Sequence, residues 1–298
     1  MKLLSTLCAT LVLAACQNHD GVAIIVDQSY RPEIVATSRE GFSAPDGLLW
    51  WDGALYMADE GGSAVRCWTP GAAPRTLAHG QGIASPEDLA RGRNGEIYFS
   101  DDDSGGIWRI GRDGRLSHLV LGLRSTEAII VAPSGDLLVG DQVGRRILRV
   151  SPDGRTSELI GAQAGIAKPE SMALDPAGNL YIADNAEDVL YLRTKDGVLH
   201  KPIHARRGFS PETLHHAGGV LYISDSKNGA VYRYTPEDGL ATIATFAGDL
   251  GNVQGLTSDD AGNLYVSVQT DLQRGRGYIL RLRRGRQKQV PAGAGCAA

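Results

Sequence analysis

Residues 168–197 read KPESMALDPAGNLYIADNAEDVLYLRTKDG, and this stretch contains most of one structural repeat. Glu170 opens an apolar run, a turn rich in Asp, Pro, Gly and Asn follows, and a second apolar run ends at Asp184. A third, alternating run (VLYLRT) precedes the turn KDG. Short apolar runs separated by turns of this composition are typical of antiparallel strands.

The same pattern occurs in five further segments of the chain, which are residues 44–59, 85–101, 125–141, 210–225 and 252–268. Neighbouring repeats lie about 40 to 43 residues apart, a fixed period that indicates a propeller or a solenoid. A fourth short run after the KDG-like turn gives four strands per repeat, which is one propeller blade. No stretch shows a sustained helical period, and 38 glycines in 298 residues supply many tight turns. We therefore predict an all-β fold, a six-bladed β-propeller with four-stranded blades around a central channel.

The sixth repeat has only three clear strands before its tail, so another segment must complete it. RPEIVATS (Arg31–Ser38) resembles the fourth strands of other repeats, and RQKQVPAG (residues 286–293) is the competing candidate. Either would close the ring and remove open sheet edges, and the sequence leaves both open. The predicted organisation is a signal peptide (1–15), an N-terminal linker with a ring-closing strand (16–41), the propeller (42–290) and a tail (291–298).

The N-terminus has the pattern of a secretory signal. Lys2 is followed by an apolar run that is too short to span a bilayer and ends in small residues. The tetrapeptide LAAC (Leu13–Cys16) resembles the lipobox of bacterial lipoproteins, which implies cleavage before Cys16 and acylation of this residue. Gln17, in place of Asp, then favours the outer membrane, so we expect a lipid-anchored protein facing the periplasm. An ordinary signal peptide with an incidental Cys is the alternative.

The net charge bears on the class of binding partner, and the cysteines bear on disulfide pairing. The formal net charge is −4, which gives no indication of a nucleic-acid partner. Cys8 leaves with the leader and Cys16 is the lipidation site, so Cys67 and Cys296 remain. In an oxidising compartment this pair is a disulfide candidate, with two independent thiols as the alternative.

The repeats share a carboxylate, or in the last repeat an amide, at one position. We call this set the axial ring: Asp46, Glu87, Glu127, Glu170, Glu212 and Gln254. Because the innermost strand of a propeller blade runs along the axis, residues just before that strand meet at one mouth of the channel. Like charges at close range need raised pKa values, water or a cation. An all-oxygen cluster selects a hard cation, with Ca²⁺ before Mg²⁺ or Mn²⁺. An acidic mouth that attracts a cationic ligand, and structural hydrogen bonding, are the alternatives.

Two further series recur with the repeats. One is an aspartate that closes the second run: Asp59, Asp101, Asp141, Asp184 and Asp225. Aspartate is suited to accept backbone N–H bonds in a turn, so we expect a structural role for this series. The other is an aromatic residue two or three places earlier, for which we expect packing between blades: Tyr56, Tyr98, Tyr181, Tyr222 and Tyr265.

The segment LDPAGNLYIADNAEDVLYLRTKDG resembles an NHL repeat, and residues from about 42 to 284 resemble the gluconolactonase- and regucalcin-like propellers. More distant resemblance extends to strictosidine synthase and paraoxonase. In the gluconolactonase-like family a divalent cation lies in the central channel, held by a Glu, an Asn and an Asp from three blades. Asp46, Glu170 and Glu212 stand at the matching positions. The Asn position is anionic here, and Glu87 and Glu127 add two acids, which favours cation binding over lactone hydrolysis.

Three classes of function follow from this resemblance. The first is a metal-dependent hydrolase of the lactonase kind, with Asp46 or Glu212 as the general base on water. The second is a non-catalytic propeller that binds a cation and presents its face to a small molecule or a protein, and the third is a metal-using lyase. His215 and His216 are the paired histidines, and Lys168 and Arg124 precede ring acids where an anion would contact them or where they neutralise the ring.

Overall fold

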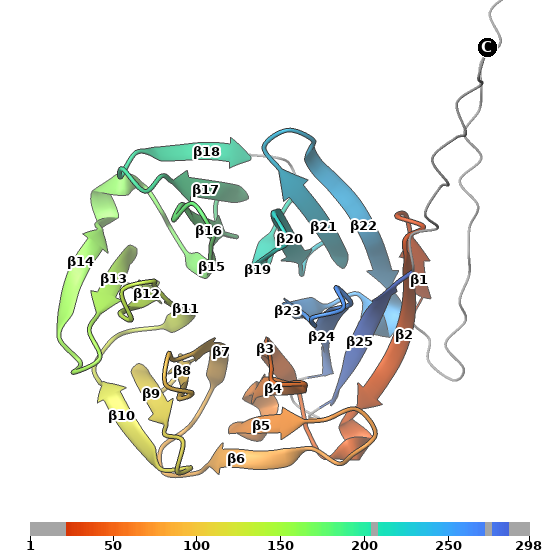
Figure 1. Ribbon diagram of the computed structural model, residues 1–298, viewed down its shortest axis with the longest axis horizontal. Coiled ribbons are helices and arrows are strands. Elements are labelled where there is room, and N and C mark those ends of the chain that lie inside the picture. Colours follow the sequence, from red (N-terminus) through yellow and green to blue (C-terminus); the bar gives the residue numbers. More distant parts are fainter. Residues whose placement is uncertain (1–21, 204–207, 272–275, 286–298) are drawn as a thin grey trace, which may run out of the picture.

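The computed structural model describes residues 22–203, 208–271 and 276–285. Six antiparallel sheets are arranged around a central axis (Figure 1). The described residues contain no α-helix, only four short 3₁₀ helices. The predicted six-bladed propeller with four-stranded blades is confirmed.

Blades one to three are each built from four consecutive strands, ordered from the axis outward. Blade one contains β3 (Pro45–Trp51), β4 (Ala54–Asp59), β5 (Ala64–Trp68) and β6 (Arg75–His79). Blade two contains β7 (Pro86–Arg91), β8 (Ile97–Asp101), β9 (Gly106–Ile110) and β10 (Leu116–Val120). Blade three contains β11 (Thr126–Val131), β12 (Leu137–Asp141), β13 (Arg146–Val150) and β14 (Thr156–Ile160).

Blades four to six continue this order. Blade four contains β15 (Pro169–Leu174), β16 (Leu180–Asp184), β17 (Val189–Arg193) and β18 (Leu199–Ile203). Blade five contains β19 (Pro211–Ala217), β20 (Val220–Asp225), β21 (Ala230–Thr235) and β22 (Gly239–Ala247). Blade six contains β23 (Val253–Ser258), β24 (Leu264–Asp271) and β25 (Arg276–Arg284). The strands nearest the axis are β3, β7, β11, β15, β19 and β23. The 3₁₀ helices are η1 (Ser38–Glu40), η2 (Glu60–Gly62), η3 (Ala162–Ala164) and η4 (Gly248–Leu250).

The N-terminal segment completes blade six. Strand β2 (Tyr30–Thr37) pairs antiparallel with β25 as the outermost strand, so the first of the two candidate segments closes the ring (Figure 1). A shorter strand that the sequence did not predict, β1 (Val22–Ile25), precedes it and pairs with the end of β22. Blade five therefore has five strands, because the nine-residue β22 extends far enough for its edge to accept another strand.

The hydrophobic core is divided among the junctions between blades. Each of the six buried clusters combines residues of two neighbouring blades, as in the cluster that joins Leu48 and Met57 of blade one to Tyr265 and Ile279 of blade six. All five predicted tyrosines take part in such clusters, and Tyr265 stacks on Trp50 with ring centroids 5.0 Å apart. Packing between blades is thus confirmed for this series.

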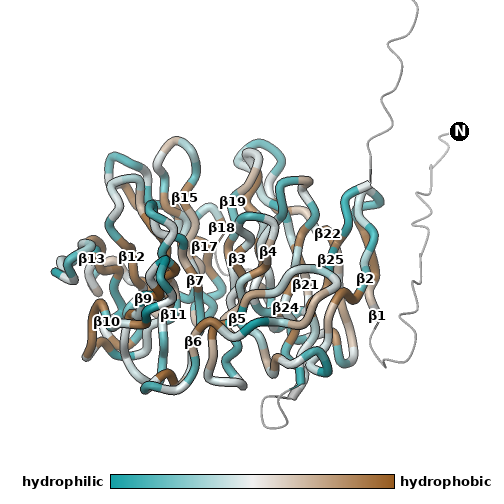
Figure 2. The backbone as a smooth tube through the Cα atoms, turned by 60° about the horizontal axis from the view of Figure 1, so that its bottom comes forward, coloured by the Kyte–Doolittle hydropathy of each residue, from teal (hydrophilic) through white to brown (hydrophobic). Residues whose placement is uncertain are grey.

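Seen from the side, hydrophobic segments lie within the strands, and hydrophilic loops occupy both faces of the propeller (Figure 2). Across the described ranges, no helix has the length and apolar character needed to cross a bilayer. The leader, Cys16 and Cys296 lie outside these ranges. Cys67 is half-buried on β5, and its pairing with Cys296 stays a prediction.

Candidate functional site

The axial ring converges as predicted. Its residues begin the inner strands, and one small cavity of about 20 Å³ is lined by all five acids: Asp46, Glu87, Glu127, Glu170 and Glu212. Gln254 occupies the equivalent place on β23, but its side-chain amide donates to Asn252 Oδ1 at 2.8 Å and does not line this cavity. The five carboxylates therefore share a volume close to that of a single water or ion.

The aspartate series holds the loops that lead into the axial ring. Asp184 accepts hydrogen bonds from the backbone N–H groups of Ala167 (2.7 Å), Lys168 (3.2 Å) and Glu187 (3.3 Å). Comparable bonds reach Asp59 from Ser43, Asp101 from Ala84 and Ser85, and Asp225 from Ser210. Because each of these four carboxylates fixes the residues just before an axial acid, the predicted structural role is confirmed and includes positioning of the ring.

Serine hydroxyls and glycines let the inner strands approach one another closely. Ser267 Oγ donates to the carbonyl oxygen of Asp46 at 2.6 Å, which links blade six to blade one. Ser224 makes the same contact with the carbonyl of Gln254 at 2.5 Å, linking blades five and six. A Cβ atom at Gly47 would collide with the carbonyl oxygen of Glu87, so this position requires glycine.

A further set of polar residues, which the sequence analysis did not predict as part of the site, lies next to the axial ring. Each member directly follows the residue that ends the second apolar run of its repeat. We call this set the second ring: Glu60, Asp102, Gln142, Asn185, Ser226 and Gln269. Several of them contact axial acids directly, as Gln269 Nε2 does with Asp46 Oδ2 at 3.3 Å. The sequence contained a signal for this ring, because a polar residue directly follows the second apolar run in all six repeats.

On one side of the channel the acids of both rings face each other. We call this the acid-rich side; it consists of Asp46, Glu60, Glu87, Asp102 and Glu127. Carboxylate oxygens of Asp46, Glu60 and Glu87 lie within 4.8 Å of one another. Their hydrogen-bond donors are neutral: Ser85 donates to Glu87 at 2.9 Å, and Gln269 donates to Glu60 at 2.7 Å. No salt bridge to these acids occurs in the described part of the chain.

On the other side the acids have partners. We call this the paired side; it consists of Glu170 and Glu212. Lys168 Nζ lies 2.9 Å from Glu170 Oε2 in a salt bridge, and Gln142 donates to the same carboxylate at 3.2 Å. Glu212 Oε2 accepts from Ser226 at 2.6 Å and from Asn185 at 3.4 Å. Lys168 therefore compensates the charge of Glu170, while Glu212 is held by two neutral donors.

Burial and mutual repulsion set the protonation of the ring. Burial is the largest cause of the raised pKa values of Asp46, Glu87, Glu127 and Glu170, and neighbouring carboxylates add to it. Lys168 opposes this rise at Glu170, and its own pKa is raised because the surrounding acids outweigh its burial. Joint ionisation of these four acids is therefore unfavourable, and a further positive charge would relieve it.

The donor chemistry of the acid-rich side fits a hard divalent cation. A Ca²⁺–oxygen distance of about 2.4 Å allows two oxygens on one ion to lie up to about 4.8 Å apart, and the Asp46, Glu60 and Glu87 oxygens lie within this limit. One oxygen of Asp102, Oδ1, is buried and has no hydrogen-bond partner in the described residues. An unsatisfied carboxylate oxygen beside an all-oxygen cluster is what a cation site requires before the ion binds.

The other predicted residues lie outside the ring. His215 shares a 2.8 Å hydrogen bond between Nε2 and Ser258 Oγ, while His216 stacks on Tyr181. Burial, with His216 nearby, lowers the pKa of His215 to about 4, so its imidazole is neutral at physiological pH. Neither histidine lines the ring cavity, and Arg124 is exposed. Of the predicted basic contacts, Lys168 is the one that meets an axial acid.

Comparisons with known proteins agree with this architecture. A family model described as strictosidine synthase-like, N-terminal, matches residues 72–110, a segment from blade one into blade two. No curated protein sequence matches the chain significantly.

Solved structures of similar fold cover most of the chain. A gluconolactonase from Xanthomonas campestris is 19% identical, with a TM-score of 0.66, over 89% of this chain and 90% of its own. Virginiamycin B lyase from Staphylococcus aureus is 14% identical, with a TM-score of 0.66, over 85% of this chain and 100% of its own. The PQQ-bound aldose sugar dehydrogenase from Streptomyces coelicolor is 15% identical, with a TM-score of 0.62, over 89% of this chain and 99% of its own. The chain therefore has the propeller fold of the gluconolactonase-like and strictosidine synthase-like proteins that its sequence resembles.

Proposed function

We propose that the protein binds one hard divalent cation at the acid-rich side of the channel mouth, with Ca²⁺ as the preferred ion. The observation that carries this proposal is the convergence of Asp46, Glu60 and Glu87 within 4.8 Å, without a basic partner in the described residues. Three carboxylates at this spacing need a counter-charge, and an ion provides more charge in less space than a side chain. Magnesium and manganese would use the same oxygen ligands.

The assignment differs from the one that the family resemblance suggests. That resemblance names Asp46, Glu170 and Glu212 as ligands, whereas the latter two are held by Lys168, Gln142, Ser226 and Asn185. Asp46 belongs to both sets. We therefore place the cation toward blades one and two, with Glu60 of the second ring as a ligand in place of Glu170.

We further propose a metal-dependent hydrolase of the lactonase kind as the activity of this site. The similarity in fold to a gluconolactonase supports it. A bound cation would supply Lewis-acid polarisation of a carbonyl oxygen. The Glu127 carboxylate has no hydrogen-bond donor in the described residues, and its raised pKa makes it a better proton acceptor than an ordinary glutamate. Glu212, the base predicted from sequence along with Asp46, is oriented by Ser226 and Asn185 and remains a second candidate.

Metal analysis and a lactone panel test the two parts separately. We expect about one equivalent of divalent cation after gel filtration, and lactone hydrolysis that chelator abolishes and Ca²⁺ restores. Less than about a tenth of an equivalent, with no thermal shift on adding Ca²⁺ or Mn²⁺, would refute cation binding. A full equivalent without hydrolysis of any lactone would leave a cation-binding scaffold that presents its face to a ligand or protein partner, which is the alternative function.

We also propose that the mature protein is an outer-membrane lipoprotein facing the periplasm. The support is the sequence LAAC at Leu13–Cys16, followed by Gln17. Replacing Cys16 with Ser should prevent labelling by a fatty-acid analogue and release a folded propeller from the membrane fraction, because this residue precedes every strand. Continued labelling of the variant would contradict the proposal.

A further inference from the structure

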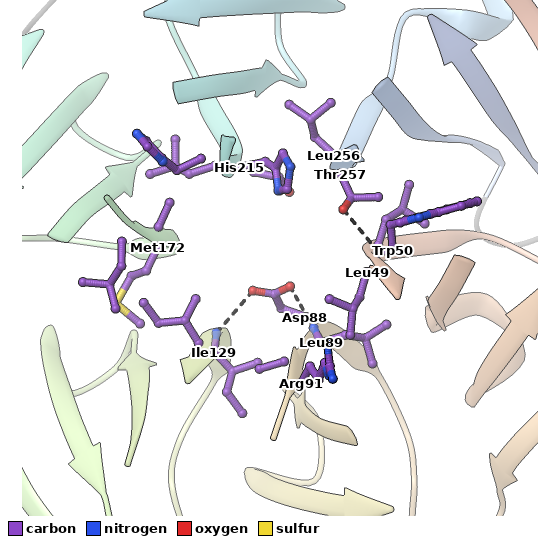
Figure 3. Close-up of a pocket in the computed structure, with 18 of the residues that line it drawn as sticks. Leu49, Trp50, Asp88, Leu89, Arg91, Ile129, Met172, His215, Leu256 and Thr257 are labelled. Atoms are coloured by element: carbon purple, nitrogen blue, oxygen red, sulfur yellow. Dashed lines mark hydrogen bonds between the residues drawn. The ribbon is translucent and has the colours of Figure 1, made fainter. Parts of the chain in front are cut away.

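A second, larger cavity lies in the channel beyond the axial ring. It has a volume of about 310 Å³ and is surrounded mainly by the C-terminal halves of the six inner strands. Its wall, part of which is drawn in Figure 3, combines polar with apolar side chains. Leu49, Ile130 and Leu174 are partly exposed there, whereas Ile129, Met172 and Leu256 are buried between blades. This volume falls at the lower end of the range for small-molecule sites.

One carboxylate belongs to this cavity. Asp88 directly follows the axial residue of blade two, and it lines both the cavity and the ring site. The equivalent residues of the other blades carry no charge: Gly47, Ala128, Ser171, Thr213 and Gly255. Asp88 is thus the single acid in its layer of the channel, and Figure 3 shows its carboxylate at the channel wall facing the opening.

The protein holds this carboxylate without neutralising it. Asp88 Oδ1 accepts from the backbone N–H of Leu89 at 2.8 Å, and Oδ2 accepts from that of Ile129 at 3.3 Å. No salt bridge to Asp88 occurs within the described ranges. Two backbone donors fix the orientation of the group, and each oxygen keeps acceptor capacity toward the cavity.

The rest of the wall adds no competing positive charge near this acid. His215, on the facing side of the channel in Figure 3, is neutral and hydrogen-bonded to Ser258. Arg91 also lines the cavity, but its side chain is exposed and its guanidinium lies 4.4 Å from the centroid of the Trp51 ring. A carboxylate in a partly apolar wall, without a basic partner, is stabilised when a cation pairs with it.

We propose that this cavity binds a small organic cation, an alkyl- or arylalkylammonium, with its ammonium group on Asp88 and its apolar body against the partly exposed Leu49, Ile130 and Leu174. The ammonium donates to the free acceptor positions of the carboxylate, and the apolar body removes hydrocarbon surface from water. Asp88 lines both this cavity and the ring cavity, whereas the rest of the cavity wall lies further along the inner strands than the metal ligands. The test must therefore distinguish binding on Asp88 from binding at the ring.

Phenethylammonium and its neutral isostere, phenethyl alcohol, provide the first test. Both are titrated calorimetrically into the mature protein in the presence of chelator. We expect saturable binding of the ammonium, and affinity for the alcohol at least about tenfold weaker, because a charge-assisted bond contributes more than a neutral one. Equal affinities, or no saturable binding of the ammonium, would overturn the proposal.

Two variants locate the binding site. Asp88→Asn should weaken ammonium binding by at least about tenfold while changing alcohol binding by less than about threefold. Leu49→Trp leaves the carboxylate in place and fills the cavity, so it should abolish binding of both compounds. Glu60→Gln, which alters the ring site, is the matched control and should leave both affinities within about twofold. Ammonium binding that survives Asp88→Asn and Leu49→Trp but is lost in Glu60→Gln would place the cation at the ring and overturn the proposal.

Discussion

The acid-rich side and the paired side of the channel mouth carry the same residue type at equivalent positions, yet their surroundings differ. Glu170 and Glu212 meet Lys168, Gln142, Ser226 and Asn185. Asp46 and Glu87 meet Glu60, and their hydrogen-bond donors are the neutral side chains of Gln269 and Ser85. The repeat alone therefore does not determine what an axial acid does. The neighbours decide: Lys168 brings a positive charge to Glu170, whereas the second ring adds the carboxylates of Glu60 and Asp102 beside Asp46 and Glu87.

The largest expected effect comes from removing charge on the acid-rich side. Glu60→Gln combined with Glu87→Gln should reduce Ca²⁺ affinity at least about hundredfold, because each lost charge removes a charge-assisted contact. Glu170→Gln is the matched control on the paired side and should change the affinity by less than about threefold, since Lys168 already compensates Glu170. Calorimetric titration of Ca²⁺ into metal-free protein gives all three affinities. A larger loss in Glu170→Gln than in the double variant would reverse the comparison.

The aspartate series should affect stability on both sides, whether or not a cation is bound. Asp184→Asn replaces a carboxylate that accepts three backbone N–H bonds, from Ala167, Lys168 and Glu187. We expect the free energy of unfolding to fall by about 1 to 3 kcal/mol, equally in chelator and in Ca²⁺. Urea denaturation under both conditions measures this. If Ca²⁺ restored the stability of this variant to that of the wild type, Asp184 would belong to the cation site.

The pH dependence of stability should reveal the unpaired acids. Their folded-state pKa values are raised above the ordinary 4.5 of glutamate and 3.8 of aspartate. The folded protein then binds more protons than the unfolded chain, so stability is highest below these ordinary values and falls as pH rises toward the raised pKa values. In chelator, a loss of about 1 kcal/mol between about pH 5 and pH 8 would lower Tm by about 2 to 4 °C.

A bound cation should remove this decline, because it keeps the carboxylates ionised without repulsion. Melting curves with Ca²⁺ are the matched condition. The same fall of Tm with pH in Ca²⁺ and in chelator would show that no cation compensates the ring.

The smallest expected effect concerns the salt bridge of the paired side. Lys168→Met leaves Glu170 without its cation, and Lys168 is 37% exposed at its side chain, so solvent screens part of the interaction. We expect stability at neutral pH to fall by about 1 kcal/mol or less. The Lys168→Met variant should also gain weak Ca²⁺ binding near Glu170, measurable as a second calorimetric site. Unchanged stability together with unchanged Ca²⁺ stoichiometry would show that Lys168 does not compensate the ring.

Much of the fold was predictable from the sequence because the repeat is regular. The period indicated the number of blades, and the similarity of RPEIVATS to other fourth strands made it one of two candidates for the closing strand. The structure selects it, as β2, which pairs with β25. Strand β1 was not predicted, since VAII (Val22–Ile25) is short and its partner is defined only by the unusual length of β22. A strand that adds to an edge in this way depends on tertiary contacts more than on its own residues.

The candidate site was predictable in composition and less so in arrangement. Convergence of the five acids followed from their repeat position, as the cavity that they share confirms. The contribution of Glu60 was missed, although Glu60 directly follows Asp59 in the sequence. Side-chain direction decides which neighbours meet, and the partnership of Lys168 with Glu170, or of Gln142 with the same acid across a blade junction, requires the folded geometry.

Locating the cation in a crystal tests the central claim most directly. Crystals of the mature protein grown with Ca²⁺ and measured at long wavelength yield an anomalous difference map of the channel mouth. A cation bound at the acid-rich side predicts a single peak at about 2.3 to 2.6 Å from oxygens of Asp46, Glu60 and Glu87. A peak centred between Glu170 and Glu212, or no peak at any position around the axial ring, would contradict it.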